Sequence, residues 1–192
     1  MKKTILTAVF LSASLVIGAA QAADYVIDTN KAHAFIQFKI KHLGYSWLLG
    51  RFNTFEGEFS YDEKNPSNSK IAVRIDPASI DSNHAERDKH LRGEDFLNVS
   101  KYPKASFISK SFKEKADGIA TLTGDFTLHG VTKELVIDVK HIGHGEDPWG
   151  GYRRGFEGKT SFALKDFDIN YNLGPASKEV ELFLSIEGIR KK

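Results

Sequence analysis

The sequence predicts an all-β fold, an eight-stranded antiparallel β-barrel with one short helical insertion. After residue 23, apolar and polar side chains alternate with period two through most of the chain, which is typical of half-buried strands. Turn-forming clusters separate the alternating segments and favour hairpin connections. The strands are long, about nine to twelve residues, and few prolines protect their edges, so a closed barrel is favoured over a two-sheet sandwich.

The alternation places the eight strands in chain order. The first has a kink, because residues 24–28 and 33–42 are expected to form one strand. His129-Gly130 lies between two alternating segments and predicts a two-residue hairpin with positive φ at both residues. Glycines 57, 124 and 158 fall on the expected inner face, where they would leave space beside aromatic rings. The remaining strands are expected around residues 55–61, 71–75, 105–109, 122–128, 135–139, 156–164 and 180–186.

One segment predicts a helix, residues 84–92. Asn83 is the expected N-cap, Glu86 completes a capping box, and Gly93 ends the helix. A second short helical turn is expected at 166–171.

The N-terminal 22 residues have the features of a secretory signal peptide. A cationic start, Met1-Lys2-Lys3, precedes an apolar segment over residues 5–20. The small-x-small pattern at 20–22 predicts cleavage between Ala22 and Ala23. The apolar segment is shorter than the ~20 residues of a membrane span, which disfavours a retained anchor. We therefore expect a signal peptide at 1–22 and a single domain at 23–192.

Charge and cysteine content exclude several functions. The chain has 27 Lys+Arg and 25 Asp+Glu, and cleavage would remove two lysines, leaving 25 against 25. A neutral protein gives no electrostatic reason to expect binding to nucleic acid or an anionic membrane surface. The absence of cysteine excludes disulfides, thiol catalysis and thiolate metal sites. No transmembrane segment is expected in the mature chain, and no cofactor.

Catalytic and metal motifs are weak. The Gly-x-Ser-x-Gly motif that carries a nucleophilic serine does not occur. Ser67-x-x-Lys70 has the spacing used by serine acyltransferases, but it lies in a polar turn and does not begin a helix. His141-x-x-His144, followed by Glu146 and Asp147, has metal-binding side chains but is better explained as a solvated strand end, so no metal site is predicted.

An acid–base group on the helix is the alternative to a purely binding role. His84 and Asp88 would share one helix face, and His90 would lie away from it. A charged surface helix explains the same three residues without catalysis, and we predict no enzymatic activity.

Aromatic content points to an apolar ligand. The chain has fourteen Phe, six Tyr and two Trp. An eight-stranded barrel has an interior that is either just filled or holds one small ligand. Two expected loops, 42–50 and 147–151, combine tryptophan with glycine and could gate the ends of the barrel.

Several motifs together resemble the YceI family. The resemblance covers essentially all of 23–190. The motifs that carry it are the segment 42–47, the helix and its continuation over 83–97, the hairpin 130–133, the loop 147–151 with 155–156, and the segments 164–167 and 173–177 near the C-terminus. It implies a lipocalin-like barrel in the periplasm that holds a polyisoprenoid, an isoprenoid quinone or its precursor, and it implies no catalytic residue. The basic stretch 152–154 departs from the familiar pattern and is expected not to touch the channel.

The expected ligand-binding residues follow from strand alternation, which a one-residue register error would invert. Two functional alternatives stay open beside a lipid carrier: an enzyme acting on a prenyl lipid through His84, Asp88 and His90, and an interaction module for a quinone-using membrane redox protein. The sequence is compatible with a monomer or a homodimer. The expected inner-face residues are Phe38, Ile40, Phe55, Phe59, Ile75, Phe126, Phe162 and Leu182, with Trp47 and Trp149 as gates.

Overall fold

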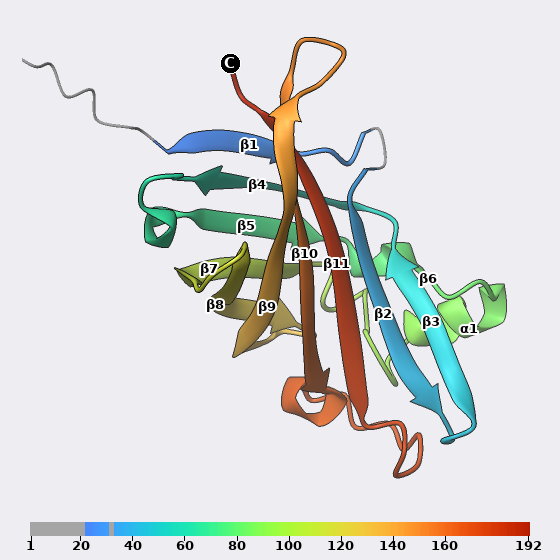
Figure 1. The fold of residues 1–192 in the computed structure, drawn as a ribbon. Coiled ribbons are helices and arrows are strands. Elements are labelled where there is room, and N and C mark those ends of the chain that lie inside the picture. Colours follow the sequence, from blue (N-terminus) through green and yellow to red (C-terminus); the bar gives the residue numbers. More distant parts are fainter. Residues whose placement is uncertain (1–21, 31–32) are drawn as a thin grey trace, which may run out of the picture.

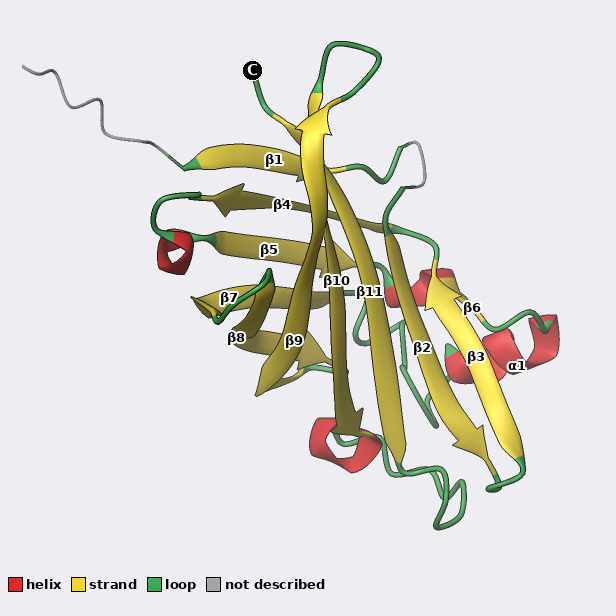
Figure 2. Ribbon diagram, in the orientation of Figure 1, coloured by secondary structure: helices red, strands yellow, loops and turns green. Residues whose placement is uncertain are grey.

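The computed structural model describes residues 22–30 and 33–192 and consists mostly of strands (Figures 1 and 2). The predicted signal peptide lies outside the described residues except for its last residue, Ala22. No helix in the described ranges is long and apolar enough to cross a membrane. The strands are β1 (Ala23–Ile27), β2 (Phe35–His42), β3 (Ser46–Phe52), β4 (Phe55–Tyr61), β5 (Lys70–Ile75), β6 (Ile80–Asp81), β7 (Ala105–Glu114), β8 (Ile119–Leu128), β9 (Val131–Glu146), β10 (Tyr152–Ala163) and β11 (Glu179–Arg190).

Eight strands close an antiparallel barrel, as predicted. The pairing order is β1-β4-β5-β7-β8-β9-β10-β11, and β1 closes the ring by pairing with β11 as well as β4. β1 pairs with β11 at residues 188–190, and β2 pairs along the same edge at 180–185. β1 and β2 therefore occupy one position in the barrel. They correspond to the single kinked strand predicted from the sequence, which the structure divides into two strands. β3 and β6 extend the sheet beyond β2.

The strand alternation predicted from the sequence is confirmed in the core. Along β8 and β9 the inner residues are buried, including Leu122, Phe126, Leu135 and Ile137. The predicted hairpin at His129-Gly130 joins these two strands, with φ of 50° and 77°. Aromatic rings of the core pack against one another mostly at tilted or edge-on angles, as the Phe126 ring does with those of Phe162 and Phe167.

The prediction of a loop at residues 42–50 is wrong, because most of that segment belongs to β3. Leu48 and Phe52 face inward, and Gly50 allows the Phe38 ring to approach: a Cβ at Gly50 would lie 2.3 Å from the ring. The segment lacks a clear polar–apolar alternation, so the sequence pattern did not indicate a strand.

The helix α1 (Ala85–Leu91) is present, but its predicted cap is displaced by one residue. His84 is the N-cap, and its Nδ1 accepts a hydrogen bond from the Arg87 N–H at 3.2 Å. Asn83 instead has a positive φ of 64° in the preceding turn. The second helical turn is a 3-10 helix at Leu164–Phe167, slightly earlier than predicted; two further 3-10 turns lie at Pro66–Asn68 and Pro77–Ser79.

Candidate ligand-binding cavity

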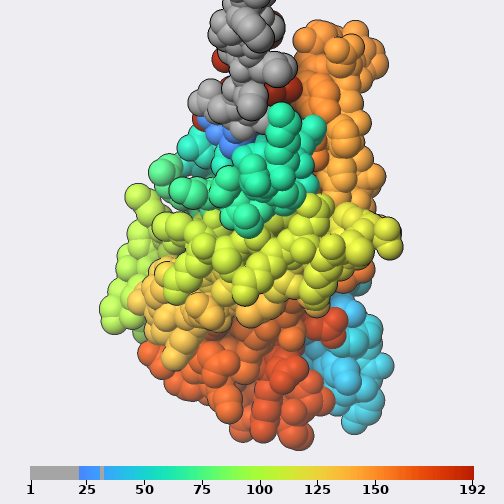
Figure 3. Space-filling view, turned by 60° about the vertical axis from the view of Figure 1, so that its left-hand side comes forward, coloured from blue at the N-terminus to red at the C-terminus, as the bar shows by residue number. Residues whose placement is uncertain are grey.

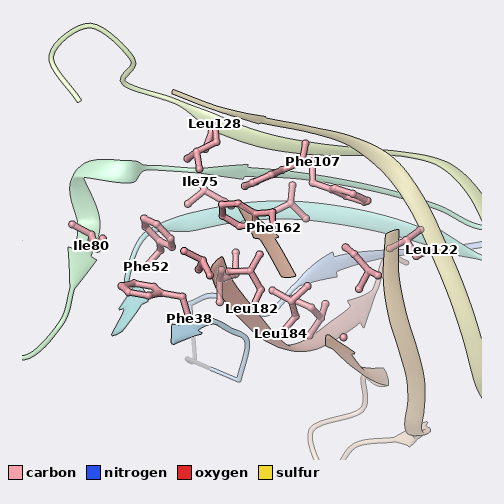
Figure 4. Close-up of a pocket in the computed structure, with 18 of the residues that line it drawn as sticks. Phe38, Phe52, Ile75, Ile80, Phe107, Leu122, Leu128, Phe162, Leu182 and Leu184 are labelled. Carbon is pink, nitrogen blue, oxygen red and sulfur yellow. The ribbon is translucent and has the colours of Figure 1, made fainter. Parts of the chain in front are cut away.

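The barrel encloses a cavity of about 490 Å³ whose lining is almost entirely apolar (Figure 4). Side chains from both halves of the barrel converge on it, including Phe107 and Leu122 from one side and Phe38, Leu182 and Leu184 from the other. This volume falls within the range of about 300–1,000 Å³ that is typical of small-molecule sites. The core is therefore incompletely filled by its own side chains.

Most of the predicted inner-face residues line this cavity. Phe55 is buried but is not among the lining residues. Trp47 and Trp149 are exposed and lie outside the cavity, so the structure does not place them as gates. Trp47 is on the outer face of β3, and Trp149 is on the loop between β9 and β10. The predicted residues that do line the cavity are Phe38, Ile40, Phe59, Ile75, Phe126, Phe162 and Leu182.

The inner glycines contribute less space than predicted. The space at Gly124 is occupied by the Phe107 ring, which a Cβ would meet at 2.5 Å. Ile27 similarly fills the space beside Gly57, and only Gly158 lines the cavity.

Sequence reasoning missed the part of the lining that lies outside the barrel strands. α1 contributes Leu91, and the segment after it contributes Phe96 and Leu97. The segment between the 3-10 helix and β11 contributes Ile169 and Leu173. These residues follow turns and lack a strand period, so alternation could not identify them; only their apolar character in otherwise polar segments was a signal.

Exposed residues lie on the cavity lining in two places, and one of them is beside α1. His42, His90 and Tyr171 line the cavity there and are also exposed, and they come from β2, α1 and the segment before β11. The His90 ring meets the Tyr171 ring edge-on, with centroids 5.4 Å apart. These groups form a polar rim on an apolar interior, which suits a ligand with a long apolar part and a polar end. A second polar group also lies on the lining: Ser60 on β4, with Ser69 and Lys70 at the start of β5.

Residues 152–154 do not line the cavity, as expected, but a buried arginine among them contacts a lining residue. Arg154 is 2% exposed, and its guanidinium lies 4.2 Å from the ring centroid of Tyr61, which lines the cavity. It also contacts the carboxylate of Glu63 and donates to the Tyr25 hydroxyl at 3.5 Å. Burial, reinforced by Glu114, raises the pKa of Tyr61 above its usual value. Tyr61 therefore keeps its proton at neutral pH beside this cation.

The acid–base candidates on α1 do not form a common site. His84 caps the helix, and Asp88 is buried, accepting bonds from the Ser82 N–H at 2.8 Å and from the Ser82 hydroxyl at 2.5 Å. His90 is paired with Asp95 at 3.0 Å. Each side chain thus has a structural partner of its own.

The His141 and His144 side chains are adjacent, but a cation lies beside them. His144 Nδ1 is 3.3 Å from His141 Nε2, and Arg154 Nη1 is 3.4 Å from the same Nε2. Burial lowers the pKa of His141, and the charges of Arg154 and His144 lower it further. This environment favours a neutral imidazole. Asp147, which was grouped with these histidines, instead pairs with Arg153.

One cluster of potential metal ligands, Asp28, His33 and Glu187, occurs in the described ranges. The Arg153 guanidinium lies between two of its members, 2.7 Å from Asp28 and 2.5 Å from Glu187. Arg153 also binds Asp147, and the pKa of that carboxyl is lowered first by the Gly151 N–H and then by Arg153. The arrangement is an ion-pair network that fastens β10 to its neighbours.

Comparison with known proteins agrees with this architecture. The family model described as YceI-like domain matches residues 25–188. The chain belongs to the YceI-like domain family. Proteins named UPF0312 from Ectopseudomonas mendocina and Pseudomonas aeruginosa are each 59% identical to it, over 100% of both chains.

Solved structures share the YceI-like fold. The YCEI protein of Campylobacter jejuni superposes with a TM-score of 0.71 at 27% identity, covering 80% of this chain and 91% of that one. BcnA from Burkholderia cenocepacia gives 0.73 at 19% identity, with coverage of 84% and 98%. A polyisoprenoid binding domain from Saccharophagus degradans gives 0.64 at 14% identity, with coverage of 89% and 100%. The last two establish similarity of fold.

Proposed function

We propose that this YceI-like protein binds one long-chain polyisoprenoid lipid, an isoprenoid quinone or its precursor, in the barrel cavity, and that it carries, stores or sequesters that lipid in the periplasm. The observation that carries the proposal is the cavity itself, which is about 490 Å³, apolar and open at a polar rim. The polyisoprenoid-binding domain with the same fold supports the choice of ligand class.

Burial of the hydrocarbon chain supplies the binding free energy. Each buried CH₂ contributes about 0.8 kcal/mol, so three five-carbon prenyl units contribute about 12 kcal/mol. Association costs about 4–15 kcal/mol, and a chain of several units can therefore offset that cost. The lining has few polar groups, so selectivity would come from the length and width of the cavity and from the rim.

Organic extraction of protein purified from its native host tests the proposal. The extract of the wild-type protein should contain a prenyl lipid in near-stoichiometric amount. Ile40→Trp places a large ring in the cavity and should lose the lipid while keeping the β-sheet circular dichroism spectrum. Gln37→Trp, on the exposed face of the same strand, is the matched control and should retain it. A folded wild-type protein that yields no prenyl lipid would refute the proposal.

Export to the periplasm is supported by the pattern of the first 22 residues. A cleaved product should begin at Ala23, the first residue of β1. N-terminal sequencing of protein from the periplasmic fraction measures this directly. A product that retains Met1, or that is found with the cytoplasmic fraction, would contradict the location.

A further inference from the structure

The hairpin between β2 and β3 has a cluster of large apolar side chains on its outer surface. Leu43, Tyr45, Trp47 and Leu49 are all exposed, Tyr45 to 88% and Leu49 to 66%. A single exposed apolar residue is ordinary, but four within seven positions form a patch of the kind that marks an interaction surface. Because β3 alternates, Leu48 between them faces the core while its neighbours face outward.

The turn of this hairpin retains an apolar residue at a strained position. Leu43 and Gly44 have φ of 52° and 84°, and the Tyr45 N–H donates to the His42 carbonyl at 2.9 Å. Asn or Gly is favoured at the first of these positions, because a branched side chain is strained at positive φ. A leucine there costs stability and adds an exposed apolar group, which is typical of a residue kept for a function outside folding.

The hairpin is also locally basic, although the mature chain is neutral overall. Residues 35–52 contain Lys39, Lys41 and Arg51 and no acidic residue. The Nζ atoms of Lys39 and Lys41 lie 4.2 and 5.7 Å from the ring centroid of Trp47. Lys39 pairs with Glu181 and Arg51 with Asp81, whereas Lys41 forms no ion pair within the described part of the chain. A tryptophan between lysines suits the boundary between lipid head groups and acyl chains.

This patch adjoins the exposed part of the cavity lining that contains His42 and Tyr171. His42, on the rim, directly precedes Leu43, and the Leu43 N–H donates to Ser177 Oγ at 3.3 Å. Ser177 belongs to the segment that also carries Tyr171. Figure 3 shows the hairpin, in light blue, beside this orange-red segment at one end of the molecule, with the β9–β10 hairpin at the opposite end.

We propose that the β2–β3 tip (Leu43, Tyr45, Trp47 and Leu49 with Lys39 and Lys41) docks on the surface of a phospholipid bilayer that contains anionic lipid. Docking turns the rim toward the membrane, so that a lipid passes between bilayer and cavity without crossing water. The proposal rests on the proposed function, because it supplies the route by which a membrane-dissolved ligand is loaded.

Two single-tryptophan proteins test this, since the chain has only two tryptophans. Trp149→Phe leaves Trp47 as the reporter, and Trp47→Phe leaves Trp149 at the other end. Both are mixed with vesicles of phosphatidylethanolamine, with and without phosphatidylglycerol and with brominated acyl chains. We expect blue-shifted, quenched Trp47 fluorescence on anionic vesicles and unchanged Trp149 fluorescence. Lys41→Gln should weaken vesicle binding about fivefold, from the usual contribution of one lysine near an anionic surface.

Leu43→Asn separates docking from folding. Asparagine relieves the strain of the turn and should raise the Tm by about 2–4 °C, while vesicle binding falls several-fold. Equal quenching of both tryptophans, or none, would overturn the proposal. Burial of Trp47 that rises with protein concentration in the absence of vesicles would also overturn it and would indicate a second copy of the chain instead. Extraction of a prenyl lipid from protein that does not bind vesicles would refute docking and leave the proposed function intact. Vesicle binding without any extractable prenyl lipid would refute the proposed function.

Discussion

Removal of the proposed lipid ligand should measurably destabilise the barrel. The cavity is about 490 Å³. Empty cavities created by mutation cost about 24 cal/mol per Å³, so this volume corresponds to about 12 kcal/mol if left empty and unrelaxed. That figure is as large as the whole unfolding free energy of an ordinary domain, about 5–15 kcal/mol. Filling the cavity with a ligand is therefore expected to stabilise the folded barrel.

The expected shift follows from the same volume. Subtracting an association cost of about 4 kcal/mol leaves about 8 kcal/mol, which corresponds to a Kd of about 1 μM. At a ligand concentration of about 100 Kd the bound lipid adds about 2.7 kcal/mol of stability. Since 1 kcal/mol shifts the Tm of a domain this size by about 2–4 °C, delipidation should lower the Tm by about 5–10 °C.

Scanning calorimetry before and after delipidation on a hydrophobic resin measures the shift. Ile40→Trp, purified without lipid, controls for damage by the resin, and its Tm should stay unchanged. Restoring a prenyl lipid to the delipidated wild-type protein should recover the original Tm. The reasoning is refuted if the lipid is removed, as shown by mass spectrometry, and the wild-type Tm does not fall.

Three further experiments give defined results. Gly124→Ala should lower the free energy of unfolding in urea by about 2 kcal/mol, because its Cβ would lie 2.5 Å from a backbone oxygen. Gly158→Ala should lower it by less than about 1 kcal/mol, because its Cβ would meet only side-chain atoms, at 3.1 Å or more. Equal losses in the two variants would contradict the packing. The pKa of His141 is lowered in the folded protein, so the unfolded chain binds this proton more readily, and the free energy of unfolding should fall as the pH drops below 6.5. His141→Gln should flatten this dependence of stability on pH. An unchanged dependence would contradict the lowered pKa of His141. His84→Ala removes the helix cap and should lower the free energy of unfolding by about 1 kcal/mol, with the lipid content unchanged. Loss of turnover on a prenyl substrate in this variant would instead favour the enzymatic alternative.

The sequence predicted the parts of the fold that a two-residue period specifies. β8 and β9 were placed on the correct face because Leu122, Phe126 and Ile137 alternate with polar residues and a positive-φ hairpin fixes their register. The same logic placed Phe38 and Leu182 at the cavity. These positions depend on local pattern, and no long-range information was needed.

The parts that were mispredicted depend on tertiary contacts. β3 pairs with β2 although its apolar residues are consecutive, since its outer face is apolar too. Trp47 was predicted to gate the cavity because it is a large apolar residue in a segment with glycine, but it lies on the outer face of β3 and does not line the cavity. Arg154 is buried against Tyr61, and this burial could not be inferred from a charged residue in a basic stretch. The contribution of α1 to the cavity likewise depends on how the helix docks.

Native mass spectrometry of the protein purified from its own host tests the central claim most directly, because it reports ligand mass and subunit count together. We predict one bound species per chain whose mass equals that of a prenyl lipid, with minor species that differ by whole prenyl units. The Ile40→Trp protein should appear at the mass of the polypeptide alone. A wild-type protein found only at its polypeptide mass, or with a bound molecule that lacks a prenyl chain, would contradict the account.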